Sequence, residues 1–193
     1  WSMETGRPPD ALLPIAPASG QARLQLLPSG PEYALQWFAT LLVWQLHQAR
    51  EQVVIVTPYF IPDEDVLAAM HAAVARGVRV ALVVSQVVDQ PLVSLAQSSY
   101  YEDLLMGGVE IYRYPRFLLH AKNLRIDNTL AVVGSSNVDL RSFQLNQEAS
   151  LLLYDAPSIA AMLRIQTAYL DASQCLTLAD WRNQIGKASC RER

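Results

Sequence analysis

The chain carries the run His120-Ala121-Lys122-Asn123-Leu124-Arg125-Ile126-Asp127 and, a short hydrophobic stretch later, Gly134-Ser135-Ser136-Asn137. We expect a β-strand over residues 117–126, in which side chains two residues apart project from the same face. His120 and Lys122 then begin a face that continues with Leu124 and Ile126, and packing alone gives two polar groups little reason to be there. An imidazole, a fixed cation and uncharged Ser and Asn donors are what attack on a phosphodiester needs.

A hairpin is expected to bring the two parts of this pattern together. Asp127-Asn128 predicts a turn, and residues 129–134 return as the next strand. Because that strand runs back along the first one, Ser135 and Asn137 come back towards His120.

The remaining chain alternates strands and helices, which predicts an α/β fold. Further strands are expected at residues 52–57, 78–85, 109–114 and 148–154. Helices are expected at residues 31–51, 63–76, 92–106 and 156–170, with a short one at 178–184. Since the hairpin is antiparallel, we expect a layered α/β/α sandwich with a mixed sheet.

Proline and glycine punctuate the first residues, which sets the expected domain boundaries. We expect residues 1–30 to be an irregular linker with at most one short strand around residues 23–27. Residues 31–185 are expected to form one folded domain, and residues 186–193 an irregular polar tail.

The composition limits the classes of function. The chain has 193 residues, 51% of them hydrophobic and 17% charged, which predicts a globular domain with a sizeable core. A net charge of −3 without any Lys/Arg run argues against a nucleic-acid partner. Cys175 and Cys190 lie far from the motif and support neither a disulfide framework nor a metal site.

We expect neither a membrane span nor a signal peptide within this sequence. The most apolar stretch, residues 34–46, is interrupted by Gln36, Thr40 and Gln45 and is shorter than the ~18–20 residues that a span needs. The chain begins with Trp1 rather than methionine, so we expect a fragment of a longer protein.

The pattern H-x-K-x4-D-x6-G-S-x-N resembles the signature of the phospholipase D superfamily. Segments outside the motif resemble, more narrowly, the second catalytic half of bacterial cardiolipin synthases. These segments are residues 57–64 (TPYFIPDE), 99–105 (SYYEDLL), 108–112 (GVEIY) and 141–146 (RSFQLN). The resemblance covers roughly residues 28–170, and it implies a phospholipase D-like fold.

The resemblance also implies a division of labour at the site. His120 attacks phosphorus to give a phosphohistidine, while Lys122, Ser135 and Asn137 hold the phosphoryl oxygens in place of a metal ion, with no cofactor. A second HxK motif faces the first across a pseudo-twofold axis and its histidine protonates the leaving oxygen. This chain has one HxK, so the second motif must come from a missing half or from a second copy.

Two acidic residues complete the candidate catalytic set of His120, Lys122, Asp127 and Glu148. Related proteins carry an acidic residue at the position of Glu148 that contacts the motif histidine, although a plain carboxylate at a strand edge is the alternative. Asp127 lies at a turn, where aspartate commonly bonds the backbone, so its expected role is structural. Arg141, Ser142 and Asn146 either line the pocket or cap the loop.

The implied reaction is the synthesis of cardiolipin from two phosphatidylglycerols, at the surface of the bacterial cytoplasmic membrane. Two alternatives remain at this point. One is a homodimeric phosphodiesterase or nuclease with one motif per chain, which calls for a basic groove. The other is an inert, membrane-associated interaction domain.

Overall fold

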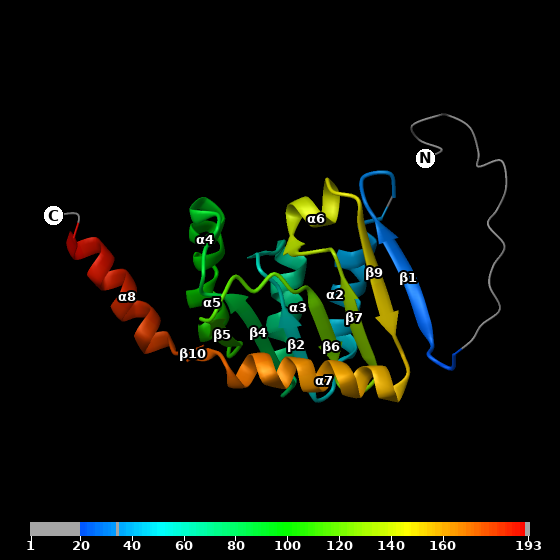
Figure 1. Ribbon diagram of the computed structural model, residues 1–193. Coiled ribbons are helices and arrows are strands. Elements are labelled where there is room, and N and C mark those ends of the chain that lie inside the picture. Colours follow the sequence, from blue (N-terminus) through cyan, green and yellow to red (C-terminus); the bar gives the residue numbers. More distant parts are fainter. Residues whose placement is uncertain (1–19, 34, 192–193) are drawn as a thin grey trace.

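The computed structural model describes residues 20–33 and 35–191, with side chains as far as residue 184. Within these residues a mixed eight-stranded sheet forms the centre of the fold, in the order β1-β9-β7-β6-β2-β4-β5-β10, and helices pack against it (Figure 1). Strands β2, β4 and β5 are mutually parallel, and the other neighbours in the sheet pair antiparallel. The expected α/β architecture with a mixed sheet is therefore confirmed.

The elements described have the following bounds. The strands are β1 (Leu24–Ser29), β2 (Gln52–Val56), β3 (Phe60–Ile61), β4 (Arg79–Ser85), β5 (Glu110–Tyr114), β6 (Asn123–Ile126), β7 (Leu130–Gly134), β8 (Val138–Asp139), β9 (Glu148–Leu153) and β10 (Gln174–Leu176). The helices are α2 (Trp37–Gln48), α3 (Glu64–Ala75), α4 (Pro91–Ser98), α5 (Tyr101–Met106), α6 (Leu140–Gln144), α7 (Ala156–Asp171) and α8 (Leu178–Arg191). No helix among the described residues is long and apolar enough to cross a membrane.

The central strands are buried on both faces because helices cover both. Val53 and Ile55 of β2 face a core that includes α2 and α3, whereas Val54 and Val56 face a second cluster that α7 covers. Strands buried on both faces consist of continuous β-branched and apolar residues, as β2 and β4 do. The layers α2/α3, sheet and α7 give the expected sandwich.

The helix starts follow from local sequence. Asp63 precedes α3 and accepts a hydrogen bond from Val66 N, and Asp155 does the same for Ser158 N at the start of α7. These carboxylates satisfy backbone donors that the first turn of a helix leaves unpaired.

The motif strand is shorter than expected. It begins at Asn123 rather than at residue 117, because β2 ends at Val56, which pairs with Asn123. Leu119 N donates instead to the side-chain oxygen of Ser85, at 3.0 Å. The alternation of sides persists in the irregular part, since Leu119 and Ala121 belong to one core cluster while Leu124 and Ile126 belong to the other.

Other expectations need correction as well. The single helix expected over residues 92–106 is two helices, α4 and α5, and the Ser98 and Ser99 hydroxyls at the break bond to carbonyls three residues earlier, a bond that competes with regular helix. The short helix α6 and the strands β3, β8 and β10 were not expected.

Both ends of the described chain are more regular than expected. The short strand expected around residues 23–27 is confirmed as β1, which extends to Ser29 and pairs with β9 along its length, whereas residues 1–19 lie outside the described residues. Helix α8 continues to Arg191, into the stretch 186–193 that was expected to be irregular.

Asp127 links the motif hairpin to the start of β2. Its carboxylate accepts hydrogen bonds from the backbone N–H groups of Arg50, Glu51 and Gln52, at 2.8–3.0 Å, and its own φ is 48°. Arg125 adds to this corner by donating to the Asp127 carbonyl and to the Gln52 side chain. The corner lies at the end of β6 opposite to His120 and Lys122.

We predict that Asp127→Ala lowers the free energy of unfolding by about 2–4 kcal/mol, because three backbone donors lose their acceptor and alanine resists the left-handed conformation. Asp127→Asn keeps one acceptor oxygen and tolerates that conformation, so it costs less. Urea denaturation measures both. A loss below about 0.5 kcal/mol for Asp127→Ala, the range of an ordinary surface change, would contradict this role.

Candidate active site

The register of β6 and β7 brings the two halves of the motif together. Asn123 pairs with Val133, and one position further Gly134 N donates to the Lys122 carbonyl at 3.2 Å. The turn that begins at Ser135 therefore starts beside Lys122. On its other side β7 pairs with β9, where Gly134 lies opposite Ser150, so the start of β9 reaches the same place.

His120 and Lys122 lie side by side. The Lys122 ammonium is 3.2 Å from His120 Nδ1 and 3.4 Å from Nε2, and it donates to the His120 carbonyl at 3.0 Å. An ammonium group can only donate, so in this contact a ring nitrogen of His120 serves as the acceptor. His120 is exposed while Lys122 is half-buried, which leaves the imidazole accessible and the cation anchored.

Burial lowers the pKa of Lys122 from its usual value, and the nearby Glu148 and Asp139 carboxylates act in the opposite direction. Burial disfavours the charged ammonium because it removes water, whereas an opposite charge favours it. Lys122 is thus a partly buried group whose charged form is favoured by two carboxylates, and water screens its field less there than at an exposed position.

Ser135 and Asn137 of the Gly134–Asn137 turn make the hydrogen bonds that hold the turn in place. Ser135 Oγ accepts from Ala149 N at 3.0 Å, and Ser135 N donates to the Ala149 carbonyl at 3.0 Å, which ties the turn to β9. Asn137 N donates to the buried Ser142 hydroxyl at 3.1 Å. The Asn137 Oδ1 atom is buried and has no hydrogen-bond partner among the described residues, so the amide retains unused hydrogen-bonding capacity.

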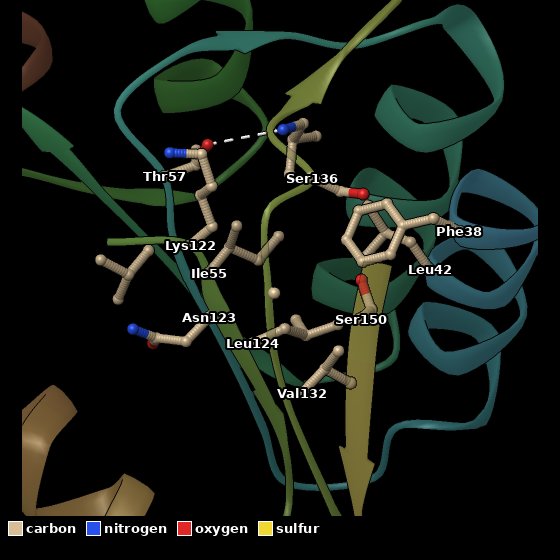
Figure 2. A pocket seen from close by; sticks show the side chains of 13 residues that line it. Phe38, Leu42, Ile55, Thr57, Lys122, Asn123, Leu124, Val132, Ser136 and Ser150 are labelled. Atoms are coloured by element: carbon tan, nitrogen blue, oxygen red, sulfur yellow. Dashed lines mark hydrogen bonds between the residues drawn. The ribbon is translucent and has the colours of Figure 1, made fainter. Parts of the chain in front are cut away.

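Two interactions also hold the Gly134–Asn137 turn against the segment that follows β2. Strand β3 pairs in parallel with β8, and Val138 N donates to Thr57 Oγ1 at 3.4 Å, the dashed line in Figure 2. The same view shows Lys122 and its neighbour Asn123 extending in different directions. The enclosed space below Lys122 measures about 10 Å³, the room of about one water molecule, so substrate must bind on the outer side.

Glu148 lies at the start of β9, beside the turn. Its Oε1 accepts from Asn146 Nδ2 at 3.3 Å, and its charge acts on Lys122. No hydrogen bond between Glu148 and His120 is present among the described residues, so the orienting role expected from related proteins stays a prediction. Asp127, at the far end of β6, does not join the group.

The structure adds residues that sequence reasoning left without a role. The Tyr59 ring lies edge-on to His120 with centroids 6.2 Å apart, and Tyr59 OH donates to Asp89 Oδ2 at 2.6 Å while accepting from Gln90 Nε2 at 3.1 Å. The Asp89 bond contributes to a raised pKa of Tyr59, after burial. Tyr59 lies within the segment TPYFIPDE that carries the family resemblance, whereas no sequence signal marks Asp89 or Gln90.

Asp139 has two effects on the site. Its Oδ1 accepts from Ser142 N at 2.7 Å and so caps α6, and its charge helps keep Lys122 protonated. Among the residues that the structure describes, no group of three or more His, Cys, Asp and Glu could hold a metal ion. A nucleophilic imidazole, a neighbouring ammonium and amide donors can together bind and attack a phosphoryl group.

The chain is similar in sequence to known cardiolipin synthases. The family described as cardiolipin synthase, PLD-like domain, matches residues 42–169. Cardiolipin synthase A from Pectobacterium carotovorum subsp. carotovorum is 36% identical over 190 residues, which cover 95% of this chain and 39% of that protein. The chain thus spans about two fifths of the length of such relatives.

Solved structures share the fold at low sequence identity. The phospholipase D family member Nuc from Salmonella typhimurium has a TM-score of 0.66 and 19% identity, covering 81% of this chain and 99% of Nuc. Phosphatidylserine synthase from Haemophilus influenzae has a TM-score of 0.63 and 15% identity, covering 88% of this chain and 46% of that one. The expected phospholipase D-like fold is confirmed by these likenesses, which at such identities concern the fold alone.

Gly134 is a sensitive position in the turn. A Cβ there would lie 2.5 Å from the Ala149 carbonyl oxygen and 2.8 Å from Ser150 Cα, so the backbone of β9 would have to move. We predict that Gly134→Ala costs about 1–3 kcal/mol of folding free energy and weakens binding of inorganic phosphate, because Ser135 and Asn137 are displaced. Urea denaturation and calorimetric titration measure the two effects.

The matched control for this change is Gly20→Ala, since no heavy atom lies within 4 Å of a Cβ at Gly20. It should alter the unfolding free energy by less than about 0.5 kcal/mol, as ordinary surface changes do. Equal effects of the two alanines would show that close packing at Gly134 is unimportant.

The charges around Lys122 give a pH prediction. Glu148 raises the pKa of Lys122, so Glu148→Gln should lower that pKa further, and the ammonium should be lost at a lower pH. The chain has only two lysines, Lys122 and Lys187, so ¹³C-lysine labelling in a Lys187→Arg background gives one lysine signal to titrate by NMR.

Glu51→Gln serves as the control, because Glu51 is an exposed carboxylate beside Asp127, at the opposite end of β6. Glu51→Gln should leave the titration midpoint of Lys122 unchanged. An unchanged or raised midpoint in Glu148→Gln would contradict the proposed effect of Glu148.

Proposed function

The chain belongs to the cardiolipin synthase family of phospholipase D-like domains, and from this premise we propose that it forms one half of a phosphatidyltransferase site acting on phospholipid phosphodiesters. The observation that carries the proposal is the contact between His120 and Lys122 beside the Ser135–Asn137 turn. This group offers a nucleophile and a cation for a phosphate without calling on a metal ion.

In the first half-reaction, a ring nitrogen of His120 attacks the phosphorus of phosphatidylglycerol. The new P–N bond forms as the P–O bond to the glycerol headgroup breaks, and glycerol leaves with a proton from the histidine of a second HxK motif. The phosphoryl oxygens accept hydrogen bonds from the Lys122 ammonium and from the Asn137 and Ser135 side chains, and the ammonium thereby leaves the ring nitrogen of His120 free to attack. Glu148 orients His120 in this proposal.

In the second half-reaction, a hydroxyl of another phosphatidylglycerol attacks the phosphohistidine. The P–O bond to that lipid forms, the P–N bond breaks, and the second histidine accepts the hydroxyl proton. The products are cardiolipin and free His120. The name of the relatives, cardiolipin synthase A, supports this choice of acceptor.

The second histidine must come from outside this sequence. His47 and His71 are not followed by lysine two residues later, and the relatives are longer than this chain by more than a factor of two. We therefore propose that a second half with its own HxK motif completes the site. It would face the edge of the sheet at which His120 lies.

The surroundings of the site support a lipid substrate at a membrane surface. Leu92 and Leu95 on α4 are 83% and 69% exposed, and Leu145 just after α6 is 67% exposed. Helices α4 and α6 stand at the same end of the sheet (Figure 1). Exposed leucines gathered beside a phosphate-binding group suit the boundary between lipid headgroups and acyl chains.

We predict that His120→Ala abolishes covalent labelling by phosphatidylglycerol with a ³²P-labelled phosphate, and with it the formation of cardiolipin. Glu148→Gln should slow labelling without unfolding the domain. The assay uses mixed micelles, with the chain alone and with the missing half supplied, followed by acid treatment, which releases a phosphate bound to histidine. The matched control is His47→Ala, an exposed histidine on α2, which should label like the unaltered chain.

Each rival function has its own outcome in this assay. Cardiolipin that forms only when the missing half is present supports the proposal. Diester cleavage by the chain alone would favour the homodimeric phosphodiesterase, and absence of labelling under all conditions would favour an inert domain. Acid-labile label in the His120→Ala chain would refute the role of that residue.

A further inference from the structure

A cavity of about 270 Å³ opens beside the motif, between α4 and α6. Asn137 belongs both to the motif and to the wall of this cavity, so the two spaces adjoin. On the α4 side the wall includes Gln90 and Val93, and on the α6 side it includes Leu140 and Arg141. The phosphotransfer reaction as proposed above uses none of these four side chains.

The cavity is small, and six of the nine side chains that line it carry polar groups, although most of the surface exposed to it is apolar. Pockets for drug-sized ligands measure about 300–1,000 Å³ and are mostly apolar, so this cavity suits something smaller. Of the described residues that line it, the polar ones are Tyr59, Gln90, Asn137, Asp139, Arg141 and Asn146, against three apolar ones. An acyl chain would leave these polar groups dehydrated and unpaired, which is costly.

The polar walls are held in place by contacts of their own. Gln90 donates to the Tyr59 hydroxyl, which in turn donates to Asp89; the Gln90 side-chain carbonyl has no partner among the described residues. On the other side, Asp139 uses one oxygen to cap α6 and Asn146 uses its amide nitrogen on Glu148. The remaining carbonyl and carboxylate oxygens are acceptors, which is what the hydroxyls of a polyol need.

Arg141 supplies the single positive side chain of the lining. It is exposed, and within the described part of the chain its guanidinium makes neither an ion pair nor a hydrogen bond. Other arginines on the surface do pair, such as Arg79 with Glu110 and Arg182 with Glu102. An unpaired guanidinium at a polar cavity is suited to a phosphate, which it can bind through two parallel hydrogen bonds.

We propose that this cavity holds the glycerol headgroup of the acceptor phospholipid, and that Arg141 binds the acceptor's own phosphodiester. The inference rests on the proposed function, in which one phosphatidylglycerol accepts the phosphatidyl group from His120. The acceptor hydroxyl and the acceptor phosphate lie at opposite ends of one glycerol unit. Asn137 belongs to the motif and Arg141 to the wall of the same cavity, so the site selects an alcohol that is already attached to a phosphate.

The test uses binding of soluble probes to the full chain and does not require turnover. Glycerophosphoglycerol, the headgroup of phosphatidylglycerol without its acyl chains, is compared with inorganic phosphate by calorimetric titration. The variants are Arg141→Ala, Gln90→Leu in the opposite wall, and Lys122→Ala at the phosphotransfer site. Arg164→Ala is the matched control, because Arg164 is an exposed arginine on α7, outside the cavity.

We expect Arg141→Ala to weaken binding of glycerophosphoglycerol by about tenfold or more, the effect of losing a charge-assisted hydrogen bond. Gln90→Leu should weaken the same probe. Binding of inorganic phosphate should be lost in Lys122→Ala and should change little in Arg141→Ala and Gln90→Leu. The Arg164→Ala chain should bind both probes like the unaltered chain. Circular dichroism of each variant verifies that it is folded.

Two outcomes would overturn the proposal: equal binding of glycerophosphoglycerol by Arg141→Ala and Arg164→Ala, or an equal loss of both probes in Arg141→Ala. The second outcome would mark Arg141 as a contact for free phosphate rather than for a headgroup. Failure of the proposed function appears elsewhere, as absence of label on His120 in the unaltered chain, so the two failures are distinguishable.

Discussion

The antiparallel pairing of β6 with β7 is the constraint on which the candidate site depends. Since Gly134 N donates to the Lys122 carbonyl, the turn that follows at Ser135 begins beside Lys122. A slip by one residue would turn every side chain of the hairpin to the other face of the sheet. Asp127 prevents such a slip at the far end, where it binds three backbone N–H groups at the start of β2.

The hairpin also places the positive charge of Lys122 next to the exposed His120 ring. Lys122 is half-buried and is held between the fields of Glu148 and Asp139, while His120 remains exposed next to it. In relatives built as longer proteins the equivalent region is one part of the whole. In this chain an ammonium group, an exposed imidazole and a turn that carries Ser and Asn are in position before any ligand binds, which fits the half-site proposed above.

Much of the fold could be predicted from the sequence because its signals are local. The runs of β2 and β4, the helices α3 and α7 with their Asp63 and Asp155 caps, and the hairpin turn all follow from periodicity and turn chemistry. The errors occur where tertiary partners decide. The motif strand starts late because β2 ends at Val56, which pairs with Asn123. Strand β10, which was not expected, forms because it pairs with the edge of the sheet at β5.

Some features of the candidate site follow from the sequence, whereas others depend on the tertiary structure. The sequence by itself determined the residues of the motif, the hairpin that joins them and the family, because six specified positions and their spacing lie within one short segment. The tertiary structure alone decided that Tyr59, Gln90 and Asp139 come to the motif and that a polar cavity opens between α4 and α6. These residues are brought together by the pairing of β3 with β8 and by the packing of separate helices, which depend on contacts between distant parts of the chain and leave no periodic trace in it.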